Sequence, residues 1–532
     1  MTKVWRIKEK STEDILEQLL INRGIKTEEE KLKFWNPKIS DYAKDLEIPG
    51  IEKTLKRIQK AIETGEQIVV FGDYDVDGIT ASAILYKGLT SLGAKVLPYI
   101  PHREKEGYGL SKLGLEFARD SGAAVVITVD NGIVAFEQAE FAKSIGLDLI
   151  ITDHHAVSDR KPDAYSIVHS TKMCGAAVAW CLIQRIVKRE LREEFLELVA
   201  IASVADMMPL IGLNRALVTE GLKELNKTKN LGLQTLITES RLEKGELKSF
   251  EIGHIIAPRI NAIGRLEHAI DALRLLCTKD PVKARRLARL LNDTNIRRRD
   301  MTVQAYEQAL KMAEKNSNQK IQVLYSKDWH QGIIGLIAGR ITESFYMPTI
   351  AISVGETVSK GSARSINGLN ITEVLRSVSS HLVDIGGHSG AAGFSIETSK
   401  IEIFKKKVEE AVLDLKIETA GEYLDIETEV PLSKITKTLA KKLEDFEPFG
   451  LENPRPTLAS FNLKVSDIRT LSGGKHLKFK ADGIDAIAFN MGELESFLQS
   501  GQLINLAYNL EINKFNGNET LQFKVKDIQL SN

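Results

Sequence analysis

Cysteine is scarce in this sequence: Cys174, Cys181 and Cys277 are the only three, and none belongs to a CxxC pair. A disulfide framework or a thiolate zinc site is therefore not expected, and a reducing cytoplasm fits this composition. The sequence also has no run of about 18 apolar residues, so we expect no membrane-spanning helix. The N-terminal stretch MTKVWRIKEKSTEDILEQLL carries too many charges for a signal peptide.

Net charge is also absent, because 72 Lys and Arg residues balance 72 Asp and Glu residues. This balance neither favours nor excludes a polyanionic partner, since a basic groove can be offset by acidic surface elsewhere. Residues 281–320 hold ten basic and four acidic side chains. Taken alone, this excess is typical of a solvated helix face. The length of 532 residues exceeds what one core holds, so two to four domains are expected.

Apolar runs of strand length alternate with helical patterns from about residue 67. The alternating segments are the runs 67–71, 123–129 and 147–152 and the helical patterns 79–92, 111–121 and 134–145. Continuous apolar runs are typical of parallel strands that are covered on both faces. The pattern therefore predicts a doubly wound parallel sheet.

The second half of the chain reads differently. A long helical pattern covers roughly 281–316, and a second α/β unit runs from 321 to about 416. After a proline-rich boundary, residues 457–532 alternate apolar and polar side chains, with Asn516-Gly517 as a hairpin turn. We expect a small all-β module there.

Carboxylates and histidines follow three of the predicted strands, and one more acid closes the apolar helical stretch 196–205. Because ligands bind beyond the carboxyl ends of parallel strands, these side chains are expected to meet in one pocket. The five that we expect to meet are Asp75, Asp77, Asp130, His154 and Asp206.

Several carboxylates in one pocket repel one another, by roughly 1–4 kcal/mol for each pair at about 4 Å. Divalent cations remove this conflict, and carboxylates with a single imidazole suit Mn²⁺ or Mg²⁺. Five ligands predict a pair of ions of the kind that hydrolyses phosphate esters. Asp130 is the candidate bridge, because its strand should be central. Plain Asp-Gly turns are the competing interpretation, and a calcium loop is disfavoured because Ile84 stands where its Glu is needed.

The motifs DYDVDG, VDNG and TDHH resemble the DHH phosphoesterase superfamily, which is named for the triplet at 153–155. The resemblance continues through PRINAIGR (258–265), DWHQGIIGLIAGR (328–340), GSARS (361–365) and GGHSGAAGFS (386–395). It spans the chain from about residue 45 to its end. In combination these motifs are similar to a bacterial branch of single-strand-specific 5′→3′ exonucleases.

The resemblance implies an α/β fold: a parallel-sheet DHH domain and an α/β DHH-associated domain, joined by a long helix, with a C-terminal OB-like β-barrel. The two α/β lobes would flank a central groove. The expected boundaries are an N-terminal helical segment 1–45, the catalytic domain 46–280, the connecting helix 281–318, the DHH-associated substrate-binding domain 319–425 and the barrel 426–532.

The resemblance also implies the site residues. It assigns metal binding to Asp75, Asp77, Asp130, His154 and Asp206, and catalysis to Asp130, His155 and Asp73, the last two as neighbours of the metals or of substrate. Nucleic-acid contacts fall to Arg103, Arg259, Asn261, Arg265, Ser362, Arg364 and His388, with Ser362 and Arg364 suited to a 5′-phosphate. For Arg103 alone, a solvated loop charge is an equal alternative.

Two departures and one open choice accompany these assignments. Phe71 stands where manganese pyrophosphatases of the superfamily carry a His, which counts against that activity. ASVAD at 202–206 replaces an expected GTVAD and weakens the assignment of Asp206. Phe479, Tyr508 or Phe515 of the tail could stack on bases or equally belong to its core.

The implied function is a metal-dependent 5′→3′ exonuclease that degrades single-stranded DNA to 5′-mononucleotides in DNA repair and recombination, with two Mn²⁺ or Mg²⁺ ions as cofactors. The alternatives are a DHH phosphodiesterase on short oligonucleotides or cyclic dinucleotides, and a non-catalytic single-strand-binding subunit. The partner is single-stranded DNA with a 5′ end, and a single-strand-binding protein and a helicase are further candidates. A monomer is favoured, with the oligomeric state left open.

Overall fold

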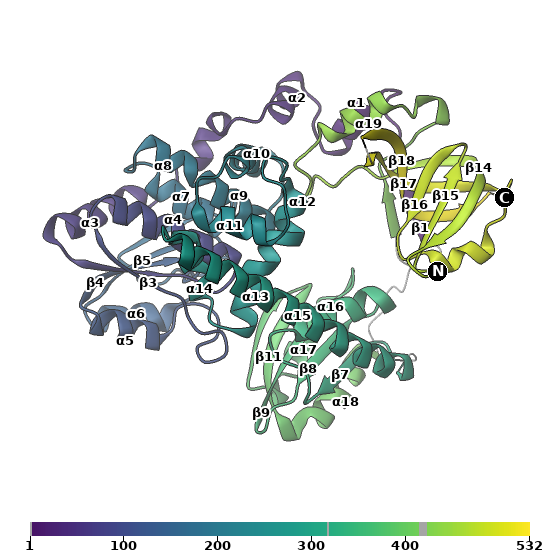
Figure 1. The fold of residues 1–532 in the computed structure, drawn as a ribbon. Coiled ribbons are helices and arrows are strands. Elements are labelled where there is room, and N and C mark those ends of the chain that lie inside the picture. The colour runs from purple at the N-terminus through teal and green to yellow at the C-terminus, as the bar shows by residue number, and fades with distance from the viewer. Residues whose placement is uncertain (1–2, 317–318, 414–422, 516, 532) are drawn as a thin grey trace. The chain divides into compact units, whose positions relative to one another are not determined.

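The computed structural model describes residues 3–316, 319–413, 423–515 and 517–531 (Figure 1). The chain divides into two compact units. The first comprises residues 1–264, 268–289 and 423–532, and the second comprises 265–267 and 290–422.

A five-stranded parallel sheet organises the first unit, as the apolar runs predict. Its order is β3 (Lys95–Tyr99), β2 (Gln67–Phe71), β4 (Ala123–Val129), β5 (Asp148–Asp153) and β6 (Ser166–His169). The strand β4 occupies the centre, where the sequence placed the strand that precedes Asp130. The edge strands β3 and β6 were not predicted.

Helices cover both faces of this sheet. The helices α5 (Lys112–Asp120) and α6 (Phe136–Ser144) close one apolar core with it, and α4 (Val76–Ser91) and α7 (Gly175–Ile183) pack on the other face. The remaining helices of this region are α3 (Ile51–Thr64), α8 (Arg189–Glu194), α9 (Leu196–Ala205), α10 (Gly212–Asn226), α11 (Leu231–Glu239), α12 (Ser249–Glu251), the π-helix η2 (Ile252–Ile256), α13 (Ala257–Leu266) and α14 (Ile270–Cys277). The helix α4 is buried almost all round, because α7, α9 and α14 surround it.

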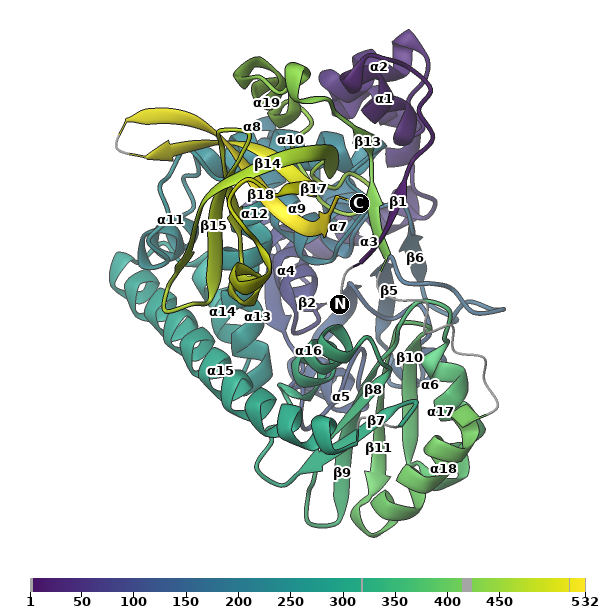
Figure 2. The same cartoon turned by 90° about the vertical axis from the view of Figure 1, so that its right-hand side faces the viewer.

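The long helix α15 (Pro281–Lys315) leads into the second unit as one unbroken element (Figure 2). The sheet of this unit has the order β10 (Asp384–His388), β11 (Ala391–Glu397), β9 (Val358–Arg364), β8 (Thr349–Ser353) and β7 (Gln322–Ser326), with only β7 and β8 parallel. One apolar core joins it to α15 and α16 (Ile334–Phe345), and a second joins it to α17 (Ile371–Ser377) and α18 (Ile401–Leu413).

The C-terminal strands close into a barrel, which confirms the predicted β module. The order β14 (Leu458–Leu471), β15 (His476–Ala481), β16 (Ile484–Ala488), β18 (Asn518–Leu530) and β17 (Leu503–Phe515) returns to β14 through a β14–β17 pairing. The hairpin joins Phe515 to Asn518, while residue 516 lies outside the described residues. Phe479 and Tyr508 are fully buried in the barrel core, so they cannot stack on bases. The burial of Phe515 also lies outside the description.

The N-terminal segment, expected to be helical, contains two α-helices and also a short strand. It contains the strand β1 (Val4–Ile7), which pairs in parallel with β12 (Tyr423–Ile426), far away in sequence. Its helices α1 (Ile15–Asn22) and α2 (Glu28–Trp35) contribute Leu19, Leu20 and Phe34 to the core of the barrel region. The two ends of the chain therefore fold together. The rest of this region comprises β13 (Thr428–Glu429), α19 (Lys437–Glu444) and 3₁₀ turns at Ile39–Leu46, Leu432–Lys434 and Gly492–Phe497. Two further 3₁₀ turns, Ser379–His381 and Thr398–Lys400, belong to the second unit.

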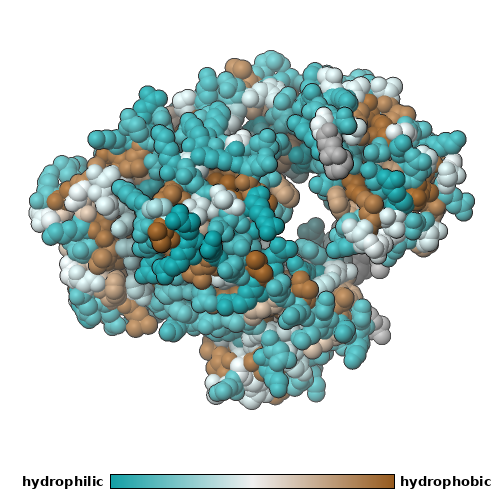
Figure 3. Space-filling view, viewed as in Figure 1, coloured by the Kyte–Doolittle hydropathy of each residue, from teal (hydrophilic) through white to brown (hydrophobic). Residues whose placement is uncertain are grey.

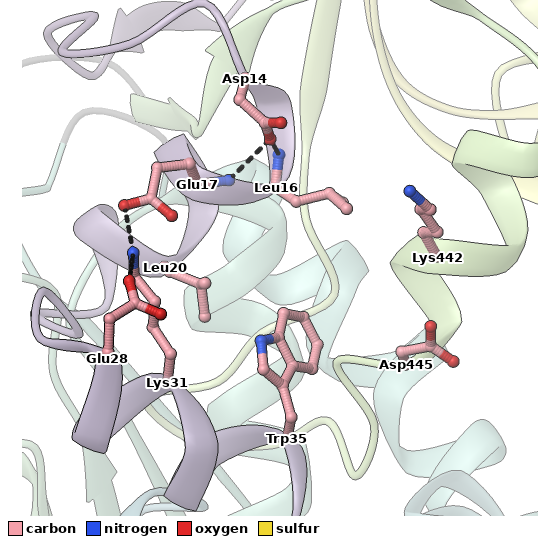
Figure 4. A pocket seen from close by; sticks show the side chains of 9 residues that line it. All are labelled: Asp14, Leu16, Glu17, Leu20, Glu28, Lys31, Trp35, Lys442 and Asp445. Carbon is pink, nitrogen blue, oxygen red and sulfur yellow. Dashed lines mark hydrogen bonds and ion pairs between the residues drawn. The ribbon is translucent and has the colours of Figure 1, made fainter.

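A mixed polar and apolar cleft of about 870 Å³ lies between α1, α2 and α19 (Figure 4). Leu16, Leu20 and Trp35 give it an apolar side, and Lys31 forms ion pairs with Glu17 and Glu28 at its rim. On the face seen in Figure 3, hydrophilic residues predominate and apolar side chains emerge in small separate groups. Among the described residues, no helix has the length and apolar character needed to cross a bilayer.

Candidate functional site

Asp130 follows the central strand β4 and lies at the carboxyl edge of the sheet. Its backbone is left-handed, with φ at 62°, which turns the chain sharply after the strand. Asn131 stabilises this turn, because its side-chain amide donates to the carbonyl of Val129 at 2.8 Å. The turn places the Asp130 carboxylate where it is buried beside the neighbouring strand ends.

Asp75 and Asp77 come from the junction of β2 and α4. Asp75 is the N-cap of α4 and accepts a hydrogen bond from the amide of Gly78 at 3.0 Å. Asp77 points at the first turn of α7, where the amides of Gly175 and Ala176 donate to its two oxygens at 2.6 and 2.7 Å. Two helix N-termini therefore fix these carboxylates.

His154 stands among three of the predicted acids. Its Nε2 lies 3.1 Å from an oxygen of Asp130, 3.5 Å from one of Asp77 and 3.7 Å from one of Asp206. Asp206 caps the C-terminus of α9, as the sequence predicts. The structure therefore places Asp206, the one predicted ligand that follows a helix, beside the predicted ligands at the strand ends.

Three overlapping clusters have ligand atoms within 4.8 Å of one another: Asp77, His154 and Asp206; Asp130, His154 and His155; Asp73, Asp75 and Asp130. Asp130 belongs to two of these clusters and joins the carboxylates of the β2–α4 junction to the histidines. All five predicted metal ligands are therefore contiguous, and Asp73 and His155 adjoin them.

Burial and mutual repulsion disfavour the charged forms of these groups. Burial, and then the charge of Asp75, raise the pKa of Asp77 to about 7, and burial with the charge of Asp77 raises that of Asp206 to about 8. Burial likewise raises the pKa of Asp130 well above its usual range. Burial and the neighbouring His155 lower the pKa of His154 to about 4, so its imidazole is neutral at pH 7.

Several atoms of the cluster are buried and, among the described residues, have no hydrogen-bond partner. They are both carboxylate oxygens of Asp73, Oδ1 of Asp130 and Nε2 of His154. The last two face each other at 3.1 Å without a hydrogen bond. A neutral imidazole nitrogen beside unpaired carboxylate oxygens is the donor set that Mn²⁺ or Mg²⁺ takes. The residues present therefore fit a divalent-cation centre.

His155 is held differently from His154. Its Nδ1 donates to Asp153 at 2.8 Å, and although burial opposes protonation, this bond and the charge of Asp153 raise the pKa of His155. The hydroxyl of Tyr108 lies 3.0 Å from Nε2 of His155 and donates to the carbonyl of Asp130 at 3.1 Å. Tyr108 is not among the predicted site residues; it lies in the loop between Gly107 and Gly109, both of which have a positive φ.

Three of the predicted nucleic-acid contacts lie in the first unit. Arg103 stacks over the ring of Tyr74 at 4.8 Å, and its charge acts on Asp73. The side-chain oxygen of Asn261 accepts from the amide of Val76 at 3.1 Å, which attaches α13 to the start of α4. Arg259 donates to the carbonyl of Ile255 at 2.7 Å. Arg103 is therefore not a free loop charge. The hydrogen bond of Asn261 holds α13 against the segment that carries Asp75 and Asp77.

The other predicted contacts belong to the second unit. Arg364 donates to the hydroxyl of Ser362 at 3.2 Å, and both lie under the first turn of α16, where a side chain at Gly335 would come within 3.1 Å of them. His388 pairs with Ala391, which in turn pairs with Arg364, so these side chains share one face of the sheet. Arg265 donates to the carbonyl of Gly332.

Comparison with known proteins follows the same division of the chain. Residues 67–203 match the DHH family N-terminal domain, 318–414 match the DHHA1 domain and 426–527 match the RecJ OB domain. The single-stranded-DNA-specific exonuclease RecJ of Bacillus subtilis (strain 168) is 33% identical over 97% of this chain and 68% of its own length. That of Escherichia coli (strain K12) is 30% identical over 97% of this chain and 95% of its own length.

The chain belongs to the RecJ family. The crystal structure of RecJ from Thermus thermophilus in complex with Mn²⁺ superposes with a TM-score of 0.86 at 28% identity, covering 99% of this chain and 80% of that one. A Mg²⁺ complex of the same protein matches as well, with a TM-score of 0.81 over 99% of this chain and 79% of that one at 28% identity. The RecJ of Thermus thermophilus thus forms complexes with Mn²⁺ and with Mg²⁺, the two kinds of cation expected at the cluster of Asp130 and His154. The predicted α/β fold with an OB barrel is confirmed.

Proposed function

We propose that this chain is a metal-dependent exonuclease that degrades single-stranded DNA from its 5′ end and releases 5′-mononucleotides in DNA repair and recombination. The observation that carries the proposal is the buried cluster around Asp130 and His154, with unpaired ligand atoms, in a chain of the RecJ family. RecJ relatives are named as single-stranded-DNA-specific exonucleases.

The reaction hydrolyses the bond between the first and second nucleotides. Water attacks the phosphorus in line, and the bond to the 3′ oxygen of the first nucleotide breaks. Bound divalent cations supply charge neutralisation on the phosphate and a water of lowered pKa. The residues that would hold two cations are Asp75, Asp77, Asp130, His154 and Asp206. Asp130 is the proposed residue between the two cations, because its cluster memberships link the carboxylates Asp73 and Asp75 to the histidines.

His155 and Asp73 act beside these ligands. Burial opposes protonation of His155, but its bond to Asp153 favours the proton and raises its pKa. It can donate that proton to the leaving 3′ oxygen or hydrogen-bond the phosphate. Asp73 keeps both oxygens without a partner among the described residues and adjoins Asp75 and Asp130, where it serves the same phosphate site.

Recognition of the strand end falls to the second unit. Arg364 offers a guanidinium fork beside the hydroxyl of Ser362, a combination suited to a terminal phosphate. His388 adds a donor on the same sheet face. Arg103, Arg259, Asn261 and Arg265 are proposed to contact the backbone of the strand.

The proposed setting is a reducing cytoplasm, which fits the three unpaired cysteines. A single-strand-binding protein and a helicase would supply the substrate, and the chain acts as a monomer. The presence of the barrel favours the exonuclease over a phosphodiesterase for cyclic dinucleotides, because a barrel of this kind tracks a longer single strand.

Digestion of an end-labelled single strand tests the proposal. With Mn²⁺, a 5′ label should leave as a mononucleotide at once, whereas a 3′ label should stay on long products, and a chelator should stop both. Asp130→Asn should abolish cleavage while the variant still retains the strand. Asp163→Asn is the matched control, since Asp163 is an exposed partner of Lys143. Early release of the 3′ label, or cleavage by Asp130→Asn, would contradict the proposal.

A further inference from the structure

An exposed aromatic pair lies on the helical segment that borders the metal centre. Phe250 of α12 is 55% exposed, and its ring stacks on that of His254, with centroids 4.3 Å apart and planes inclined by only 16°. Nδ1 of His254 donates to the carbonyl of Phe250 at 3.2 Å, which fixes the imidazole. Single exposed apolar residues are common on protein surfaces, so the informative feature here is the parallel stacking of two exposed rings.

The helical segment 249–266, formed by α12, η2 and α13, contacts two elements that carry candidate metal ligands. At one point it packs on α9, since a side chain at Gly253 would lie 3.5 Å from Val204, two residues before Asp206. At another point Asn261 accepts from the amide of Val76, between Asp75 and Asp77. Both views of the ribbon show α12 beside α9 (Figures 1 and 2).

The aromatic pair is also held rigidly. The hydroxyl of Ser249 donates to the carbonyl of Phe449 at 2.7 Å, which anchors the start of α12. The π-helical turn η2 follows immediately, and such turns are frequent at functional sites. Met207, next to the candidate ligand Asp206, is a further apolar side chain that is 66% exposed.

We infer that the Phe250–His254 pair is a base-stacking subsite for the single strand whose backbone is cut at the metal centre. This inference rests on the proposed function. It adds a contact to the bases through the stacked rings. The residues of the proposed function instead contact the metals, the phosphate or the backbone of the strand, and the acids and His154 are assigned to the scissile phosphate.

Fluorescence of 2-aminopurine tests the inference directly, because stacking quenches this base. Single substitutions along a 5′-phosphorylated oligothymidylate, bound in chelator to prevent cleavage, should reveal one or two neighbouring positions that are quenched by the wild-type chain. Phe250→Ala should abolish this quenching and weaken strand binding about 5- to 150-fold, the effect of losing one stacked base. Phe250→Trp should retain both. Phe250→Leu, which stays apolar but has no π face, should lose both.

Leu32→Ala is the matched control, since Leu32 is an exposed apolar residue on α2. With Mn²⁺, Phe250→Ala should raise KM for the long strand more than it lowers kcat, because the pair contacts bases and not the reacting phosphate. Equal quenching in wild type and Phe250→Ala, or equal affinity, would overturn the subsite and would indicate another occupant, such as a protein. If the wild-type chain neither binds nor digests single strands, the proposed function fails and the subsite fails with it.

Discussion

Gly175 occupies a position where any side chain would disturb the metal centre. A Cβ atom there would lie 2.7 Å from Cβ of Asp130 and 2.9 Å from its Oδ1. Carbon atoms in contact prefer about 3.5–4.0 Å, so Gly175→Ala requires an opening of roughly 1 Å. Either Asp130 moves away, or the first turn of α7 retreats and lengthens its 2.6 and 2.7 Å bonds to Asp77.

Both responses displace a candidate metal ligand by more than the about 0.2 Å that a coordination site tolerates. We therefore expect Gly175→Ala to weaken Mn²⁺ binding at least about tenfold. A misplacement of this size costs on the order of 100-fold in turnover. The effect on helix formation has the opposite sign, because Ala at the first position of α7 is favoured over Gly by up to about 1 kcal/mol.

Calorimetric titration with Mn²⁺ measures the first effect, and digestion of labelled single strands measures the second. Gly339→Ala is the control: this glycine lies inside α16 with nothing within 4 Å of a Cβ atom, so the substitution should be neutral or slightly stabilising. If Gly175→Ala binds Mn²⁺ as tightly as the wild type and cleaves at the same rate, Asp130 does not hold the metal in the way proposed.

Three further substitutions test other parts of the chain. Burial raises the pKa of Glu197 to about 8, so the folded state binds the extra proton and stability falls as pH rises from about 4.5 to 8. Glu197→Gln should abolish this slope and stabilise the fold above pH 8 by up to about 4–5 kcal/mol, measured by urea unfolding. Parallel pH profiles of stability for the two proteins would refute this prediction. Tyr108→Phe removes the hydroxyl that contacts His155 and should slow single-turnover cleavage about tenfold with unchanged Mn²⁺ affinity; an unchanged rate would exclude a role for the hydroxyl. Arg364→Ala should erase the preference for 5′-phosphorylated over 5′-hydroxyl strands, and an unaltered ratio of the two rates would remove its role at the strand end.

The sequence predicted the central strands because their side chains are apolar on both faces, as in QIVVF and AAVVITV. It missed β3, whose sequence KVLPY is only partly buried and contains Pro98. An edge strand tolerates proline because one side of it forms no ladder, so the local pattern resembles a loop. The pairing of β1 with β12 was equally out of reach, since residues so distant in sequence leave no periodic signal in either strand.

The sequence could predict those site residues whose positions follow from the order of the parallel strands alone. Asp130 and His154 follow neighbouring parallel strands, so their meeting is a consequence of the sheet. Tyr108 and Gly175 act through the shape of a loop and through a close backbone approach, neither of which a hydrophobic pattern encodes. The Phe250–His254 pair has the i, i+4 spacing of a helix face, but only its exposure distinguishes it from core residues.

The hydrogen bonds of the strand-end acids separate structural carboxylates from those that await a cation. Asp153 accepts from the amides of Ile133, His154 and His155, and although burial opposes ionisation, its bond to His155 and these amides lower its pKa. Asp153 is therefore a stable anion without a metal. Asp130 is also buried, yet its Oδ1 has no partner among the described residues, and burial and the charge of Asp77 raise its pKa.

A fold that only needed acidic turns at this edge would supply Oδ1 of Asp130 with an amide, as it does the oxygens of Asp153. Leaving such oxygens unpaired costs about 1–3 kcal/mol for each group, and more if the group is charged. A bound divalent cation recovers this cost without a proton, because the same unpaired oxygens then become ligands. The pattern of missing hydrogen bonds, more than the number of acids, is therefore what identifies the carboxyl edge of β4 as a cation centre.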